Sequence, residues 1–171
     1  MDKEYLVVDG YNVINSWPDL SALKEESLEH ARDKLVQIMQ NYAVFKDVKV
    51  IVVFDGQYSL HKTQSLYKED KVEVLYSKKG ETADMVIEKL IDSLPQDSKK
   101  VVATSDWVEQ RIILGKGALR MSVRELFIRV QEAEMGIKKE MGSRKSKSSS
   151  SLEGQLKESI REKFDNWRRK P

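Results

Sequence analysis

Four aspartates stand at the ends of apolar runs or at the start of a helical pattern. Asp9 ends LVVD, Asp55 ends VVFD, Asp106 ends VVATSD, and Asp84 lies in ETAD. Carboxylates brought within a few ångströms repel one another, so that one of them protonates or the group binds a cation. Two or three carboxylates with retained waters form the hard oxygen site that Mg²⁺ or Mn²⁺ prefers. These aspartates are therefore candidate metal ligands.

A metal ion at such a site lowers the pKa of a bound water and stabilises the charge that develops on a phosphate. Metal-assisted hydrolysis of a phosphodiester follows, and it needs no nucleophilic side chain. The sequence contains no cysteine, which excludes thiolate zinc sites and cysteine nucleophiles. It also contains no GxxxxGK[ST] phosphate-binding loop, which excludes one large class of phosphoryl-transfer enzymes.

Each aspartate taken alone also has a structural interpretation. Aspartate is common in turns and at helix N-termini, where its oxygen accepts from backbone N–H groups. This alternative applies most to Asp84 and Asp106, since each lies in the first turn of a predicted helix. The combination of acids predicted at one sheet edge favours the metal site.

Residues beside these acids are candidates for supporting roles. Asn12 follows Asp9 by three residues and could orient a water or a phosphate oxygen, or simply stabilise a turn at Gly10 and Tyr11. Gly10 permits backbone conformations and close approaches that a side chain would block. Tyr11 and Trp107 each adjoin a candidate ligand. Either could stack on a nucleic-acid base, a contact worth about 1–3 kcal/mol, or pack on the sheet edge.

The elements that would position these residues alternate between strands and helices. Continuous apolar runs are typical of strands covered on both faces, and the intervening segments have helical periodicity. Such alternation predicts an α/β domain with a mostly parallel sheet, whose strands deliver their carboxyl ends to one edge where ligands bind. The predicted strands span 5–8, 50–54 and 101–103, with a weaker one at 72–76, and the predicted helices span 27–44, 82–95, 105–115 and a segment that begins at 122.

The composition along the chain predicts a division into three parts. Residues 1–141 form the α/β domain, although 56–70 fit neither period and are long for a compact loop. Residues 142–151 are rich in serine and lysine and predict a flexible linker. Residues 152–171 place apolar side chains at helical spacing and predict a basic amphipathic helix.

Charge is distributed unevenly along the chain, although the net charge is only +2. Residues 1–120 carry 17 basic and 20 acidic side chains, and residues 121–171 carry 13 and 8. A basic tail beside an acidic site suits a polyanionic substrate whose chemistry needs metal, and a solvated helical tail is the alternative. The sequence has no signal-peptide pattern and no apolar run near the ~20 residues of a membrane span. We therefore expect a cytoplasmic protein without a membrane partner.

Four motifs together resemble the NYN-domain proteins, a branch of the PIN-like metal-dependent ribonucleases. They are VVDGYN at 7–12, VVFDG at 52–56, ETADMVIEKL at 81–90 and VATSDWVEQ at 102–110. The sequence is similar in particular to the YacP-type group of small bacterial proteins, whose characterised form is a ribosome-associated mRNA endonuclease. That similarity continues through GKGALRMSVREL and into FDNWRRK near the C-terminus.

The resemblance implies a PIN-like three-layer α/β/α sandwich with a C-terminal helical extension and an Mg²⁺- or Mn²⁺-dependent acidic site. Asp9 and Asp84 would be the essential metal ligands, Asp106 would complete the site, Asp55 would be a fourth member, and Asn12 would be a supporting polar group.

The implied activity is cleavage of single-stranded mRNA on a translating ribosome. The alternatives are a non-catalytic PIN-like module that binds RNA or ribosomes, and a different phosphoryl enzyme such as a phosphatase or a flap-type DNA nuclease. The sequence leaves the oligomeric state open. The basic residues that could neutralise rRNA phosphates are Lys138, Lys139, Arg144, Lys145, Lys147, Arg168, Arg169 and Lys170.

Overall fold

The computed structural model describes residues 3–58, 68–69, 71–105 and 115–144. The chain divides into two compact units, Met1–Ala133 and Glu134–Pro171. The first unit contains the sheet and the candidate ligands. The described part of the second unit is helical over residues 134–144.

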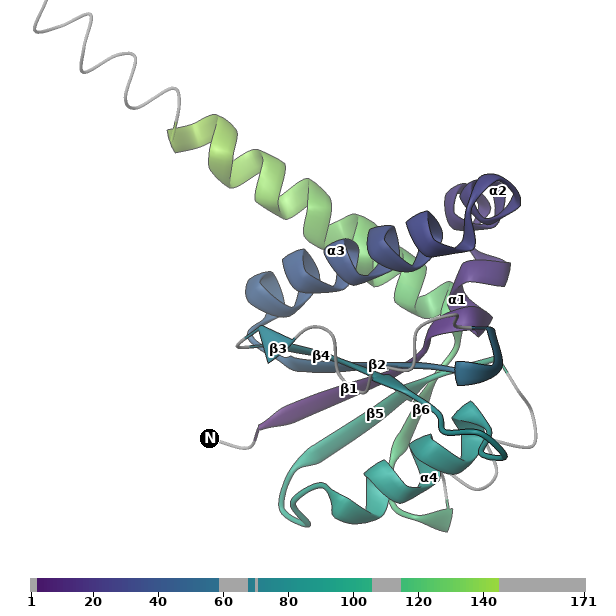
Figure 1. Cartoon of the computed structure of the whole chain (residues 1–171). Coiled ribbons are helices and arrows are strands. Elements are labelled where there is room, and N and C mark those ends of the chain that lie inside the picture. The colour runs from purple at the N-terminus through teal and green to yellow at the C-terminus, as the bar shows by residue number, and fades with distance from the viewer. Residues whose placement is uncertain (1–2, 59–67, 70, 106–114, 145–171) are drawn as a thin grey trace, which may run out of the picture. The chain divides into compact units, whose positions relative to one another are not determined.

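A six-stranded sheet with the order β3-β4-β2-β1-β5-β6 forms the middle layer of the first unit (Figure 1). Five strands are parallel, and the two-residue edge strand β3 is antiparallel to β4. Central β1 pairs with β2 and β5, so Val7 lies opposite Ile51 and Val102. The strands are β1 Glu4–Asp9, β2 Lys49–Phe54, β3 Lys68–Glu69, β4 Val72–Tyr76, β5 Lys99–Ala103 and β6 Leu119–Met121.

Helices cover both faces of this sheet, which confirms the predicted α/β/α sandwich. Helices α1, α2 and α3 lie on one face, and α4 lies on the other (Figure 1). Alternate strand residues supply the two apolar layers: Val8 and Val52 pack under α1–α3, whereas Val7 and Val53 pack under α4. The helices are α1 Gly10–Ser16, α2 Pro18–Glu26, α3 Leu28–Lys46, α4 Ala83–Ser93 and one over residues 123–144, with a 3₁₀ turn η1 at Gly56–Tyr58.

The helix starts agree with the capping signals in the sequence. Ser27 Oγ accepts from the His30 N–H at 3.3 Å at the start of α3, and Thr82 Oγ1 accepts from the Met85 N–H at 3.3 Å at the start of α4. Ser122 Oγ accepts from the Glu125 N–H at 3.0 Å. Helix α4 ends at Ser93, just before Pro95. Local capping chemistry therefore sets these boundaries.

Besides η1 and β3 in the 56–70 segment, three elements were not predicted, and their short length explains why. Helix α1 has seven residues and α2 has nine, with few buried side chains each, so neither shows clear periodicity. Pro18 is the first residue of α2, where its missing N–H costs nothing. Strand β6 has only three residues.

The prediction of a turn after Asp9 and part of the linker prediction were wrong. The chain enters helix α1 directly at Gly10, so Gly10 and Tyr11 are helical. Residues 142–144, expected to begin the flexible linker, continue the preceding helix. The predictions for 145–151, for 152–171, for most of the 56–70 segment and for the helix after Ser105 lie outside the described residues.

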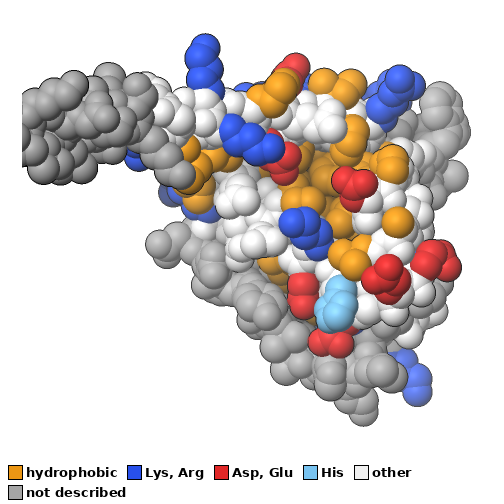
Figure 2. Space-filling model, turned by 90° about the horizontal axis from the view of Figure 1, so that it is seen from above, with side chains coloured by type: hydrophobic (Ala, Val, Ile, Leu, Met, Phe, Trp, Pro, Cys, Tyr) orange, Lys and Arg blue, Asp and Glu red, His pale blue; other side chains and the backbone are white. Residues whose placement is uncertain are grey.

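The surface on the α3 side of the sheet carries mixed charge. Figure 2 shows acidic and basic side chains interspersed around hydrophobic ones on this face. The described part of this face therefore has no field of a single sign that would steer a polyanion. Among the described residues, no helix is long and apolar enough to cross a membrane.

Candidate active site

A cleft of about 410 Å³ lies where β1 and β2 end and α4 begins. Three of the four predicted aspartates, Asp9, Asp55 and Asp84, line it together. The fourth predicted ligand, Asp106, and its neighbour Trp107 lie outside the described residues. The cleft is lined by Asp9, Tyr11, Asn12, Asn15, Lys24, Leu28, Asp55, Thr82, Ala83 and Asp84.

Asp9 is the last residue of β1 and the N-cap of α1. Its Oδ1 accepts a hydrogen bond from the Asn12 N–H at 3.3 Å, and the residue is only 9% exposed. The next residue must be glycine, because a Cβ on Gly10 would lie 2.2 Å from Cε1 of Phe54. The predicted need for close approach at Gly10 is therefore correct. The capping role of Asp9 is real as well, and it does not exclude a role in the cleft.

Asn12 joins two segments that are distant in the sequence. Its backbone N–H donates to Asp9, and its side-chain Oδ1 accepts from the Ser105 N–H at 2.9 Å. Ser105 lies two residues after β5 ends, and the neighbouring Thr104 is fully buried. The Asn12 amide thus holds the chain after β5 against the start of α1. The sequence pointed to Asn12 but not to this contact.

Asp55 follows β2 and is held by neutral donors. Its Oδ1 accepts from the Gln57 N–H at 2.9 Å and from Ser77 Oγ at 3.4 Å. Ser77 Oγ also accepts from the Gly56 N–H at 2.9 Å, and Ser77 is only 6% exposed. A Cβ on Gly56 would lie 2.0 Å from the Ser77 carbonyl oxygen. Ser77 and Gly56 therefore fix the carboxylate of Asp55, and the sequence analysis missed both.

Asp84 enters the cleft from the other face of the sheet. It is the second residue of α4, after the cap Thr82, and its side chain is exposed. The positive end of the helix dipole favours a carboxylate in this turn. Glu81, in contrast, does not line the cleft. It bonds to Lys89 and to the Lys78 N–H, which hold the pKa of Glu81 below its usual range.

Tyr11 lines the cleft and is also packed. Its ring centroid lies 5.1 Å from that of Phe54, and its hydroxyl accepts from Arg32 Nη1 at 3.0 Å. The packing alternative is therefore confirmed for Tyr11, and base stacking stays a prediction. On the same wall, Lys24 Nζ donates to Asn15 Oδ1 at 2.7 Å. Sequence reasoning missed this pair because its two members lie on different helices without a shared motif.

The donor set suits a hard cation in chemical type. All three acids in the cleft are carboxylates, and Mg²⁺ is usually bound by one or two carboxylates, retained waters and substrate phosphates. No three acidic or histidine side chains among the described residues are grouped closely enough to hold a metal by themselves. A fourth candidate ligand, Asp106, is outside those residues. The side chains in the cleft therefore match Mg²⁺ or Mn²⁺ in chemical type, and the described residues alone do not form a grouped metal site.

The predicted RNA- or ribosome-binding residues fall mostly in the C-terminal part of the chain. Lys138, Lys139 and Arg144 are exposed on the helical residues of the second unit. The others lie outside the described residues: Lys145, Lys147, Arg168, Arg169 and Lys170.

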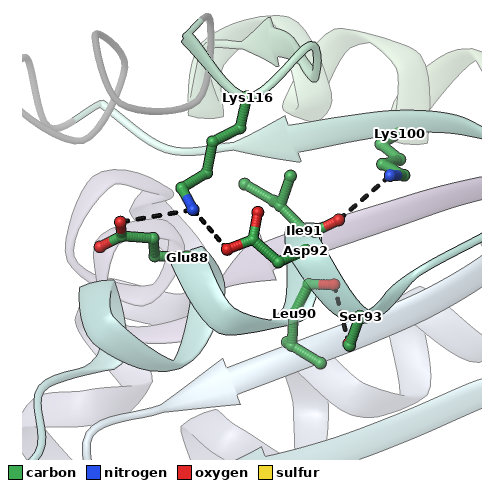
Figure 3. A network of polar contacts seen from close by, with 7 residues as sticks. All are labelled: Glu88, Leu90, Ile91, Asp92, Ser93, Lys100 and Lys116. Atoms are coloured by element: carbon green, nitrogen blue, oxygen red, sulfur yellow. Dashed lines mark hydrogen bonds and ion pairs between the residues drawn. The ribbon is translucent and has the colours of Figure 1, made fainter. Parts of the chain in front are cut away.

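A second acidic group lies on α4, away from the residues that line the cleft. Lys116 Nζ lies 3.5 Å from Glu88 Oε1 and also pairs with Asp92 (Figure 3). The hydrogen bond to Asp92 is the main cause that raises the pKa of Lys116 above its usual range. Nearby, the buried Lys100 donates to the Ile91 carbonyl at 3.1 Å and satisfies an acceptor in the last turn of the helix. Lys116 therefore offsets one of the two negative charges of this acidic group.

A carboxylate-lined cleft at the carboxyl edge of a mostly parallel sheet, with helices on both faces, is the usual position of a ligand site in an open α/β fold. The chain belongs to the YacP-like NYN domain family, which it matches over residues 6–169. It is 41% identical over 170 residues to the protein YacP of Bacillus subtilis (strain 168), and the match covers 97% of each chain.

Two solved structures are also similar to this chain in fold. The crystal structure of Rae1 (YacP) from Bacillus subtilis matches with a TM-score of 0.75 and 41% identity, over 99% of this chain and 95% of that one. The crystal structure of a tryptophan-to-leucine mutant of that same protein matches with a TM-score of 0.69 and 44% identity, over 79% of each chain. The family and the fold together make this protein a member of a nuclease family.

Proposed function

We propose that this protein is a metal-dependent endoribonuclease that hydrolyses phosphodiester bonds in mRNA, in the cytoplasm and in association with the translating ribosome. One observation carries the proposal: Asp9, Asp55 and Asp84, which come from three separate parts of the chain, line a single cleft. Membership of the YacP-like NYN family supports nuclease chemistry at that cleft.

In this mechanism Asp9 and Asp84 would hold Mg²⁺ or Mn²⁺, Asp106 would complete the site, and Asp55 would be a fourth member. When bound, the metal lowers the pKa of a coordinated water and stabilises charge on the phosphate. The protein contributes positioning. Ser77 and the Gln57 N–H fix Oδ1 of Asp55, and they leave its other oxygen without a bond from the described residues.

Asn12 has a separate task in this mechanism. It bonds to the Ser105 N–H, one residue before Asp106. Its amide therefore fixes the chain segment from which Asp106 must reach the cleft. This role is positioning, since the Asn12 oxygen is occupied by the Ser105 N–H.

The proposed ribosome contact rests on the basic C-terminal part of the chain. Residues 121–171 carry 13 basic and 8 acidic side chains, and Lys138, Lys139 and Arg144 are exposed. Lysine and arginine that neutralise phosphates release counterions, so this association should weaken steeply with salt.

The test is an mRNA cleavage assay with purified ribosomes, with Mg²⁺, with Mn²⁺ and with a chelator. The wild type is compared with Asp9→Asn and Asp84→Asn, and ribosome binding is measured in parallel by sedimentation. We expect cleavage only with metal, and its loss in both variants with sedimentation unchanged. Equal cleavage by wild type and variants would overturn the metal site. Binding without cleavage under every metal condition would replace the proposal by a non-catalytic ribosome-binding module.

A further inference from the structure

Lys24 is the one cation among the described residues that line the cleft. It lies in the last turn of α2, and its Nζ donates to Oδ1 of Asn15 on α1 at 2.7 Å. Both side chains line the cleft on the wall formed by the first helices, and Asp84 lines it from α4. The cleft therefore combines an acidic part with a single positive charge.

The partner of Lys24 differs from the partners of four other lysines among the described residues. Within the described residues, Lys71, Lys89, Lys99 and Lys116 each pair with a carboxylate. Lys24 bonds to a neutral amide, and no ion pair with a carboxylate of the described residues accompanies that bond. An ammonium group has three N–H donors, and the Asn15 bond uses one of them. The charge and two donors of Lys24 remain for a ligand.

A contribution to folding stability does not explain why Lys24 is paired with Asn15. The Lys24–Asn15 bond is exposed to solvent, where such a contact contributes little to folding. A single-stranded RNA approaching the cleft, on the other hand, brings negatively charged phosphates to a lining that includes acidic side chains. A cation on the facing wall reduces the repulsion between them and gives the chain a fixed contact.

We propose that Lys24, held in place by Asn15, binds a non-bridging phosphate oxygen of the single-stranded RNA beside the phosphodiester that is cleaved. The contact positions the backbone and carries no sequence information, because every nucleotide has the same phosphate. This inference rests on the proposed nuclease function and adds a substrate-positioning residue to it.

The test measures RNA binding by the full chain as a function of salt. An Asp84→Asn background with Mg²⁺ present prevents turnover, and a fluorescein-labelled oligouridylate reports binding by anisotropy. We expect Lys24→Ala to weaken binding several-fold at low salt. It should also reduce the slope of log K against log salt by about 0.7, the value for one lost phosphate contact on a single strand.

Three control variants separate this role from charge loss and from misfolding. Lys34→Ala removes an equal charge from α3, in a hollow it shares with His30 rather than in the cleft, and should leave the slope unchanged. Lys24→Arg keeps the charge and should keep the slope. Asn15→Ala frees the ammonium group, so it should weaken binding while leaving the slope near that of the wild type.

Two results would overturn the inference in different ways. If the slope of log K against log salt is the same for Lys24→Ala and Lys34→Ala, Lys24 does not contact a phosphate. The cleavage defect of Asp84→Asn would still support the nuclease function in that case. Absence of RNA binding by every variant, together with undiminished cleavage by Asp84→Asn, would overturn the proposed function and this inference with it.

Discussion

Charged side chains in the cleft and on α4 are arranged in opposite ways. On α4, the carboxylates of Glu88 and Asp92 share Lys116, which offsets one of their two negative charges (Figure 3). In the cleft, Asp55 receives its hydrogen bonds from a backbone N–H and a hydroxyl, and Lys24 donates to an amide. The two arrangements use the same residue types, but the partners differ.

The difference shows which charges are available to a ligand. A carboxylate already paired with lysine attracts a further cation weakly, since the pair is close to neutral beyond its own dimensions. A carboxylate held by neutral donors is oriented and keeps its charge. The α4 group is paired within the protein, whereas in the proposed function the charges of Asp55 and Lys24 serve a metal ion and a phosphate.

The largest effect should separate Asp84 from Asp92, two exposed acids eight residues apart on α4. Asp84→Asn should lower the cleavage rate by roughly a thousandfold, because metal-based charge stabilisation is worth several kcal/mol. Asp92→Asn should change it less than about twofold. Single-turnover cleavage with Mg²⁺ measures both. A comparable loss of cleavage rate in Asp92→Asn would contradict the distinction between the acids of the cleft and the acids paired with Lys116.

Gly56→Ala should destabilise the fold strongly. The added Cβ would lie 2.0 Å from the Ser77 carbonyl oxygen, a backbone atom that cannot rotate away. We expect a loss of about 2–3 kcal/mol in the free energy of unfolding, measured by urea denaturation. Gly115→Ala is the matched control, because its Cβ meets no atom within 4 Å. Equal stability of the two variants would show that the Asp55 turn tolerates displacement.

Ser77→Ala should weaken metal binding by about tenfold, because the hydroxyl positions Asp55 in the way that outer residues orient metal ligands. Calorimetric titration with Mn²⁺ measures the dissociation constant without requiring turnover. Ser77→Thr keeps the hydroxyl and should restore affinity. Ser93→Ala, which removes an exposed hydroxyl at the end of α4, should have no effect. Unchanged Mn²⁺ affinity in Ser77→Ala would exclude Asp55 from the site.

The smallest effect on stability should come from Lys116→Met, which removes the lysine that pairs with Glu88 and Asp92. The folded state raises the pKa of Lys116, so the stabilisation is fully present below the ordinary lysine pKa and is lost as pH rises through the raised value. We expect a small drop in the urea midpoint at pH 7 that disappears at strongly alkaline pH, with cleavage unchanged. If the urea midpoint of Lys116→Met stayed lower at a pH where the Lys116 ammonium group is deprotonated, the effect would come from packing of the lysine side chain.

Local signals in the sequence predicted a large part of the fold. The apolar runs gave the four longer strands within one or two residues, and the helices predicted to begin at 27, 82 and 122 each have a side-chain cap at that position. They succeeded because strand burial and helix capping depend on residues within a few positions of one another. Short elements such as α1 and β6 carry too few residues for a period to appear.

The sequence by itself determined which acids could form a site, since the parallel α/β pattern places strand ends at one edge. Only the tertiary structure decided what holds them. Ser77 reaches Asp55 across 22 residues, Asn12 reaches Ser105 across 93, and Lys24 meets Asn15 between two helices that the sequence did not predict. These contacts depend on how elements pack, which no local pattern records, and they give the cleft its particular distribution of charge.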